Sequence, residues 1–162
     1  MNKSIEKSGA QVRVVNPRAH YYTQSAITIA VDTAYVIQNG GGNISNGIYM
    51  LDNRSTNGST SEGTMELHSV VNLEDLIGFL VVPINPNSND TVAITGIQVS
   101  DGSVFGSTGY PFQVSKDGSY WIGQAINSNT QLTTYQIQIK VTTGGPRPSI
   151  FYVSWDPFIA TN

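Results

Sequence analysis

The clearest pattern in this chain is a strict alternation of apolar and polar residues over Tyr135–Val141. The odd-numbered positions are Tyr, Ile, Ile and Val, and the even-numbered positions are Gln, Gln and Lys. Because successive side chains of a β-strand point to opposite faces, this segment is predicted to be a strand with one buried and one solvated face. Turn signals at 117–118 and 144–146 separate it from two neighbouring segments, Ser119–Ile126 and Ile150–Trp155. We expect these three strands to form a meander at the core, with the last one covered on both faces.

Several other runs of β-branched and apolar residues are bounded by turn residues. The segments predicted as strands are Ser25–Gln38, interrupted at Asp32, and Ile48–Leu51, Thr64–Val71, Leu76–Ile84 and Thr91–Ser100. In the last of these, a bulge at Gly96 would explain a change in the phase of the alternation. No window shows a sustained apolar period of 3.6 residues. The predicted fold class is therefore all-β, a single antiparallel β-sandwich or jelly-roll-like domain of about eight strands.

Two parts of the chain lack this pattern. Residues 1–24 are mostly polar, and we predict a flexible N-terminal arm that pairs with or swaps onto a neighbouring copy; a disordered tail is the alternative. Residues 103–114 are expected to be irregular because their glycines and proline discourage regular pairing. Residues 25–162 then form one β-sandwich domain, which fits the usual size of a single domain.

The chain carries few charges. Charged residues make up 12% of it, about half the usual share for soluble domains. The formal net charge is −3, and the arginines Arg13, Arg18, Arg54 and Arg147 are scattered singly. Electrostatic binding of nucleic acid or of an anionic membrane needs clustered lysine and arginine, so neither partner is expected. A surface of hydroxyl and amide groups repels copies of itself only weakly, which favours self-association.

Compartment signals are absent from the sequence. The chain has no cysteine, so it has no disulfide framework and no thiolate chemistry. Its first residues lack the continuous apolar region of a signal peptide, and no apolar run approaches the roughly 20 residues of a transmembrane helix. We therefore expect a soluble cytoplasmic protein, with non-classical export as the alternative.

Groups suited to catalysis are sparse. Only His20 and His68 carry an imidazole, and no serine lies in a G-x-S-x-G elbow. Glu74-Asp75 is an adjacent carboxylate pair, but adjacent strand residues point to opposite faces and would not flank one bond. We interpret this pair as solvated turn residues. The chain is therefore expected not to be an enzyme and to need no cofactor.

One loop is a weak candidate for calcium or sugar binding. It contains Asn85, Asn87, Asn89 and Asp90, and alternating oxygen-bearing side chains in a loop can ligate calcium, as in the sugar sites of lectins. The loop lacks the acidic density and distal glutamate of a strong calcium site. Asn, Ser and Asp also dominate ordinary turns because they bond their own backbone. Both interpretations stay open.

The main aromatic group consists of Tyr120, Trp121, Tyr152 and Trp155. Aromatic platforms bind sugars and proteins, but in a small sandwich such side chains more often fill the core. We expect core packing for this group, so that Trp155→Ala costs several kcal/mol once the resulting cavity is included.

Three motifs stand out along the chain. They are the strand Ile27–Thr33 with an aspartate inside an aliphatic run, the segment Tyr120–Ala125 ahead of the alternating strand, and the ending Trp155–Ile159. Together they resemble the PixA/AidA inclusion-body protein family of bacteria. Tyr49-Met50 and Leu73–Phe79 also match the family pattern. The residues that carry the resemblance, expected to be structural, are Asp32, Tyr120, Trp121, Trp155, Asp156, Pro157 and Phe158.

This resemblance implies a non-enzymatic bacterial protein, deposited in some members as intracellular crystalline inclusions and linked in some to interaction with a host. It carries over no catalytic residue. Crystalline members of the family are rich in methionine, whereas this chain has 3, so a methionine store is not implied. The leading prediction is a self-assembling protein that forms homo-oligomers or ordered inclusions. The alternative is a lectin-like carbohydrate-binding module, with or without calcium, whose partners are glycans.

Overall fold

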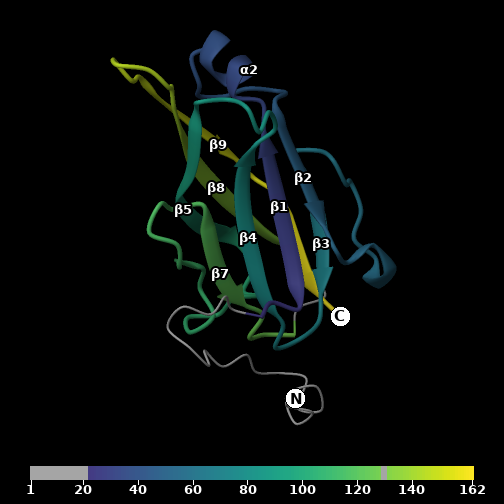
Figure 1. Ribbon diagram of the computed structural model, residues 1–162. Coiled ribbons are helices and arrows are strands. Elements are labelled where there is room, and N and C mark those ends of the chain that lie inside the picture. Colours follow the sequence, from purple (N-terminus) through teal and green to yellow (C-terminus); the bar gives the residue numbers. More distant parts are fainter. Residues whose placement is uncertain (1–21, 129–130) are drawn as a thin grey trace, which may run out of the picture.

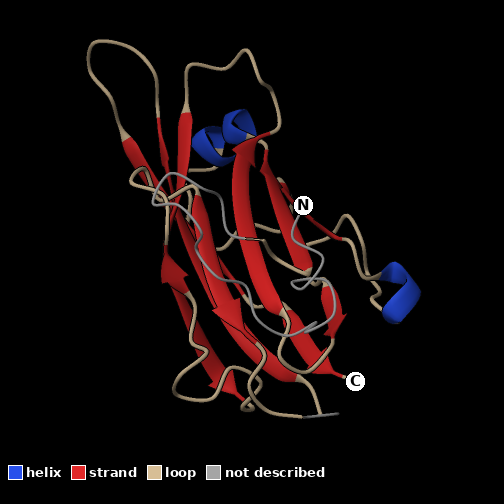
Figure 2. Cartoon of the chain, turned by 60° about the horizontal axis from the view of Figure 1, so that its bottom comes forward, coloured by secondary structure: helices blue, strands red, loops and turns tan. Residues whose placement is uncertain are grey.

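The structure, a computed structural model, describes residues 22–128 and 131–162 and confirms the predicted all-β fold (Figure 1). Its described residues form ten strands, one short α-helix and one 3-10 turn. The strands make two sheets that face each other, and the helix and the 3-10 turn lie in connections outside the layers (Figure 2). The count is ten strands where the pattern predicted about eight, because two short strands, β6 and β10, carry little alternation of their own.

The first sheet, sheet A, has the strand order β2-β1-β4-β7-β6. Its strands are β1 (Ser25–Val31), β2 (Ile48–Asp52), β4 (Leu76–Pro83), β6 (Phe112–Gln113) and β7 (Tyr120–Gln124). β1 and β4 lie side by side at its centre and run parallel, while the other pairs run antiparallel (Figure 1). Sheet A is therefore mixed where a purely antiparallel arrangement was predicted.

The second sheet, sheet B, has the order β3-β10-β8-β5, and β9 also pairs with β8. Its strands are β3 (His68–Val71), β5 (Thr91–Asp101), β8 (Thr133–Thr142), β9 (Ile150–Trp155) and β10 (Phe158–Thr161). β10 and β3 run parallel, so this sheet is mixed as well. β9 and β10 pair with different ends of β8, because the chain bends at Asp156-Pro157 between them.

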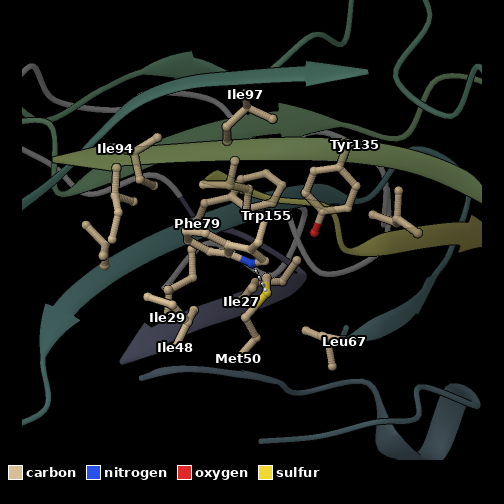
Figure 3. Close-up of a cluster of buried hydrophobic side chains, with 14 of the residues drawn as sticks. Ile27, Ile29, Ile48, Met50, Leu67, Phe79, Ile94, Ile97, Tyr135 and Trp155 are labelled. Carbon is tan, nitrogen blue, oxygen red and sulfur yellow. Dashed lines mark hydrogen bonds between the residues drawn. The ribbon is translucent and has the colours of Figure 1, made fainter. Parts of the chain in front are cut away.

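The core lies between the two sheets (Figure 3). The alternation that predicted β8 is confirmed, since Tyr135, Ile137, Ile139 and Val141 are all fully buried. The ring of Tyr135 meets that of Phe79 from sheet A edge-on, with 6.0 Å between the ring centroids. Such edge-to-face contacts add to the free energy gained from burying apolar surface.

Residues 103–114 contribute more to the core than their sequence predicts. Most of the segment is irregular, as expected, and only β6 pairs regularly. Its Val104 and Phe105 are nevertheless fully buried, and the ring of Phe105 packs edge-on against Tyr135 at 6.1 Å. The segment has no apolar–polar alternation, so its sequence does not predict that these two side chains are buried.

The prediction of one interrupted strand over Ser25–Gln38 is wrong in its second half. The strand ends at Val31, and Thr33–Gln38 forms a short helix, α2, at one end of the sandwich (Figure 1). Asp32 caps this helix, because its carboxylate oxygen accepts a hydrogen bond from the amide of Tyr35 at 3.1 Å. The β-branched residues that follow Asp32 carry only a weak β preference, which capping and the burial of Val36 override.

The predicted three-strand meander is confirmed for β8 and β9, which pair antiparallel, and is wrong for β7. β7, which ends at Gln124, lies in sheet A, whereas β8, which begins at Thr133, and β9 lie in sheet B. β9 is not covered on both faces, because Ile150 is 52% and Tyr152 is 51% exposed. The strand is therefore apolar on two faces, of which one is buried and the other is exposed to solvent.

Two smaller expectations have clear outcomes. The bulge at Gly96 is confirmed by a shift in the β5–β8 register between Ile94 and Gly96, which leaves Ile94 and Ile97 both buried. The strand predicted over Thr64–Val71 is shorter, since regular pairing begins only at His68. Residues 60 and 64 instead form isolated bridges, to His68 and Met50.

The predicted N-terminal arm falls mostly outside the described residues, which begin at Tyr22. Gln24, however, is bound into the domain. Its side-chain oxygen accepts a hydrogen bond from the amide of Leu76 at 2.7 Å, and its carbonyl accepts one from Asn53 at 3.1 Å. The folded domain therefore includes Gln24.

Candidate functional site

A pocket of about 690 Å³ opens between the edges of the two sheets, beside β2 and the end of β9. Three chain segments form its walls: Asn43–Asn46 after α2, residues 61–66 ahead of β3, and Ser154–Asp156. The start of β2 completes the lining. The pocket therefore includes Trp155 and Asp156 of the C-terminal motif and Tyr49 of the Tyr-Met pair.

The first wall is held against β9 by glycines. The amide of Gly42 donates a hydrogen bond to the carbonyl of Tyr152 at 2.7 Å. Gly41 has a φ of +76°, and a Cβ at that position would lie 2.7 Å from the same carbonyl oxygen. Only glycine fits there without a shift of the backbone, so the glycine run places the Asn43–Asn46 segment at a defined position beside β9.

The second wall is held against β2. The amide of Met50 donates to the carbonyl of Thr64 at 3.2 Å, and the amide of Gly63 donates to the carbonyl of Met50 at 2.7 Å. Within the wall, the hydroxyl of Thr64 donates to the carbonyl of Ser61 at 2.7 Å. Ser61 has a φ of +62°, a conformation that non-glycine residues adopt rarely and that this framework maintains.

The third wall rests on Trp155, which is only 5% exposed. Its indole N–H donates to the sulfur of Met50 at 3.1 Å across the core, so the ring bridges sheet B and sheet A (Figure 3). Past it, the carbonyl of Pro157 accepts a hydrogen bond from the amide of Tyr135 at 3.1 Å. These contacts fix the bend that presents Asp156 at the pocket.

The pocket has a definite electrostatic character. Its acidic residues are Glu66 and Asp156, and both are exposed. No lysine, arginine or histidine lies among the described residues that line it. Neither carboxylate has a hydrogen bond or ion pair with another residue in the described ranges. The remaining polar groups are amides and hydroxyls, which both donate and accept hydrogen bonds.

The motif residues outside the pocket have structural positions. Trp121 faces inward opposite Phe79, and its indole N–H is buried without a partner among the described residues. Tyr120 covers Gly78, where an added Cβ would lie 2.5 Å from the tyrosine oxygen. The amide of Phe158 donates to the carbonyl of Leu67 at 3.0 Å and starts the pairing of β10 with β3.

The predicted calcium or sugar loop is built as a turn that ties other segments together. Asn85 accepts a hydrogen bond from the amide of Asn87 at 3.0 Å. The carboxylate of Asp90 accepts one from the hydroxyl of Thr33 at 2.8 Å and one from the amide of Gly144 at 3.0 Å. These bonds, from Gly144 first, hold the pKa of Asp90 below its ordinary value. Both carboxylate oxygens of Asp90 are thus engaged within the chain, while the exposed Asn89 has no assigned role.

Among the residues that the structure covers, no cluster of three or more histidines, cysteines or carboxylates is placed to hold a metal. Calcium or sugar binding at the Asn85–Asp90 loop stays a prediction.

The interpretation of Glu74-Asp75 as a solvated pair is wrong for Asp75. Glu74 is exposed, but Asp75 is 5% exposed and pairs with Arg54. A buried carboxylate is stable only with such partners, and the partner lies 21 positions away in the sequence, where no local pattern reveals it. Of the two histidines, His68 is half-buried on β3 and His20 lies outside the described residues.

Sequence reasoning missed the pocket as a site. Its walls come from segments far apart in the chain, and only the Trp155-Asp156 motif pointed to one of them. The aromatic group divides between roles: Trp155 is buried as predicted, whereas Tyr152 faces outward from β9.

Comparison with known proteins supports the fold. A family model described as Domain of unknown function (DUF8788) matches residues 23–146. The crystal structure of the inclusion body protein PixA from Burkholderia cenocepacia J2315 is similar, with a TM-score of 0.70 and 18% sequence identity. The similarity covers 91% of this chain and 100% of that one. The resemblance to inclusion-body proteins is thus confirmed as a shared fold.

A comparison with curated protein sequences gave no match. In the ranges that the structure describes, no helix is both long and apolar enough to cross a membrane.

Proposed function

We propose that this chain, which belongs to the family described as Domain of unknown function (DUF8788), is a non-enzymatic protein that self-assembles through the outer face of sheet A. The observation that carries the proposal is the composition of this face. Sheet A has one face in the core, and sheet B does not cover the other face, where Leu51 of β2 and Leu80 of β4 are exposed. At β7 the outer face is partly covered, since Ile122 is 2% exposed and lies beside residues 108–112.

The outer face is mostly apolar, with Thr28 and Gln124 as its polar side chains apart from the hydroxyls of tyrosine. The strand registers place Tyr49 and Leu51 of β2, Leu80 of β4 and Phe112 of β6 on it. These side chains are 37% to 53% exposed. The other outward positions hold Ala, Thr, Leu, Gly, Val, Tyr, Ile and Gln. A contiguous apolar surface of this kind marks an interaction site.

The charge on this face favours a second copy of the same chain as its partner. No acidic or basic residue occupies an outward position of the five strands. Two copies with a net charge of −3 each can therefore meet there without placing like charges opposite each other. A face with no charges also cannot form ion pairs with a strongly charged partner.

The size of the face fits a weak, concentration-dependent dimer. Five strands spaced about 4.8 Å apart and about five residues long on average, at about 3.3 Å per residue, span on the order of 400 Å². Two copies would bury on the order of 800 Å² between them, which is below the roughly 1,000 Å² of a stable specific interface and in the range of transient contacts. The interface would be isologous, with the same strands on both sides.

The comparison adds further support. The similar structure is described as an inclusion body protein, and an ordered inclusion requires contacts between copies. The same proposal includes accumulation inside the cell and a role in interaction with a host. Both follow from the family that the motifs of this chain resemble. The scarcity of acid–base pairs in the sequence supports a non-enzymatic role.

Size-exclusion chromatography with light scattering tests the proposal over a micromolar to millimolar range. We expect a concentration-dependent oligomer for the full chain and a monomer for Leu51→Lys combined with Leu80→Lys. Ile150→Lys is the matched control, because it places the same charge at an exposed apolar residue of β9, in the other sheet.

A third variant, which lacks residues 1–21, separates this face from the predicted arm. The truncation keeps Gln24, whose hydrogen bonds belong to the domain. Assembly that survives both lysines but is lost with the arm would assign the contact to the arm. A full chain that stays monomeric at millimolar concentration would refute self-assembly.

A further inference from the structure

The pocket beside β9 lies at the side of the sandwich and shares only Tyr49 with the outer face of sheet A, so assembly through that face does not account for the pocket. We propose that this pocket binds a neutral saccharide, with Asp156 and Glu66 as the acceptors for sugar hydroxyls. This proposal does not depend on self-assembly, and it places a carbohydrate site away from the Asn85–Asp90 loop.

The charges of the pocket select against anionic ligands. The two acidic side chains of its described lining are carboxylates, and no lysine, arginine or histidine is among the described lining residues to pair with a phosphate, sulfate or carboxylate group. Carboxylates accept strong hydrogen bonds from hydroxyl groups, and their two oxygens can accept from neighbouring hydroxyls of one sugar ring. An uncharged ligand rich in O–H donors fits this arrangement.

The other lining residues match the rest of a sugar. Asn43, Asn46 and Ser154 supply amide and hydroxyl groups, which both donate and accept hydrogen bonds as ring and hydroxyl oxygens require. Ile44 and the exposed ring of Tyr49 add apolar surface against which the C–H face of a ring can pack, whereas Trp155 is almost fully buried behind them. A mixed lining with a few polar groups is typical of small-molecule sites, and the volume lies within their usual range of about 300–1,000 Å³.

The pocket is also held in place before any ligand binds. Backbone hydrogen bonds fix both loop walls, at Gly42–Tyr152 and at Met50–Thr64, and the indole of Trp155 is bonded to Met50. A site built on such contacts loses little conformational entropy on binding. This matters for a saccharide, because each hydroxyl that binds must first give up its bonds to water.

A calcium ion alone is a poorer fit. Calcium takes 6–8 oxygen ligands at about 2.3–2.6 Å. The pocket offers two carboxylates, and no group of three metal-binding side chains occurs anywhere in the described ranges. The opening is also far larger than one ion.

A glycan array tests the proposal with the full-length protein. The array carries neutral oligosaccharides ending in mannose, galactose or N-acetylglucosamine, beside sialylated and sulfated ones, and is run with EDTA and with calcium chloride. We expect binding to neutral glycans in EDTA. The best-bound neutral oligosaccharide is then titrated by NMR against the wild type and three variants.

Asp156→Asn and Glu66→Gln keep the side-chain shape and remove the charge. Each is expected to weaken binding by roughly tenfold or more, as the loss of a charged hydrogen bond implies. The control is Asp101→Asn, an exposed carboxylate on β5 at the opposite edge of sheet B, which should leave the affinity unchanged. Circular dichroism and the Tm confirm that all three variants fold.

Three results would overturn the proposal. One is an array silent for neutral glycans or bound only at anionic ones. Another is binding that neither Asp156→Asn nor Glu66→Gln weakens. The last is binding that requires calcium and is lost in Asp90→Asn, which would move the site to the Asn85–Asp90 loop. None of these outcomes bears on the oligomeric state, so self-assembly stands or falls separately.

Discussion

The guanidinium of Arg54 donates a hydrogen bond to the carboxylate of Asp75 at 2.5 Å, and the hydroxyl of Ser25 bridges the pair. That hydroxyl donates to Asp75 at 2.9 Å and accepts from the Nε of Arg54 at 2.8 Å. The amide of Asn72 donates to the same carboxylate at 3.0 Å. The cluster joins the start of β1, the loop after β2 and the turn before β4, so it fixes how these segments of sheet A meet.

Breaking this cluster should destabilise the protein strongly. Removal of one partner from a buried ion pair leaves an uncompensated charge and costs about 3–5 kcal/mol. We expect a loss of this size for Arg54→Ala, since it leaves Asp75 buried and charged. Asp75→Ala should cost less, because the side chain of Arg54 is 20% exposed and water can reach it.

Urea denaturation of the two single variants and of the double variant measures the coupling. The double variant should be more stable than the sum of the two losses predicts, because no charge is left without its partner. Additive losses would contradict a direct interaction between the two side chains.

Trp155 should be the most costly single truncation in the core. Trp155→Ala removes a buried indole that spans both sheets and should cost about 3–5 kcal/mol, including the cavity. Trp155→Phe keeps most of the volume and should cost clearly less. Far-UV circular dichroism in urea is the measurement, because its signal comes from the backbone and does not depend on the indole that both variants remove. Equal stability of Trp155→Ala and wild type would show that this contact between the sheets does not support the fold.

Asp90 should make stability depend on pH in the acid range. Hydrogen bonds from Gly144 and Thr33 hold its pKa below the ordinary 3.8 in the folded protein. A carboxyl with a lowered folded pKa stabilises the fold above its unfolded pKa, and this contribution disappears as the pH falls through the folded value. Asp90→Asn should therefore lower the urea midpoint at pH 7.

Below the folded pKa of Asp90, the difference between wild type and Asp90→Asn should narrow, because the wild-type carboxyl is then protonated too. Asp101→Asn is the control, since Asp101 is an exposed carboxylate on β5. A difference for Asp90→Asn that stays constant from pH 7 to the acid range would refute the link to ionisation.

The hydroxyl of Tyr135 has no hydrogen-bond partner among the described residues, although the side chain is fully buried. Burial raises the pKa of this phenol, and the charge of Asp52 raises it further, so the group stays neutral. An unpaired buried hydroxyl costs about 1–3 kcal/mol of desolvation. Tyr135→Phe should therefore leave the free energy of unfolding unchanged or raise it, by up to about 2 kcal/mol.

Thermal and urea unfolding of Tyr135→Phe give the answer. A matched reference is Tyr135→Leu, which removes the ring contacts with Phe79 and Phe105 and should destabilise the protein. A destabilised Tyr135→Phe would mean that the hydroxyl is hydrogen-bonded after all.

Local pattern was sufficient for several elements. The alternation in β8 and the buried positions of β1 follow from side-chain geometry within one strand, and the bulge at Gly96 follows from the phase of its own neighbours. The helix after Asp32 was missed although its capping residue is local, because the residues that follow carry a competing β preference. The exposed face of β9 was missed because an apolar sequence is the same whether a strand is covered on one face or on both.

The candidate sites show the same limit. The motif Trp155-Asp156 pointed to one wall of the pocket, but the glycines of the first wall and the Ser61 turn carry no sign of which strand they meet. The Arg54–Asp75 pair could not be recognised from two residues 21 positions apart. Both depend on contacts made only after the strands have paired.

The amino-acid sequence alone determines that this protein is all-β, weakly charged and free of cysteine, and which residues of its periodic strands face inward. The tertiary structure decides the strand order, the parallel pairs β1–β4 and β10–β3, the outer face of sheet A and the pocket beside β9. The physical reason is that a period of two assigns each side chain to a face of its strand. Which strand lies alongside depends on burying those faces together over long connections, and that is a property of the whole chain.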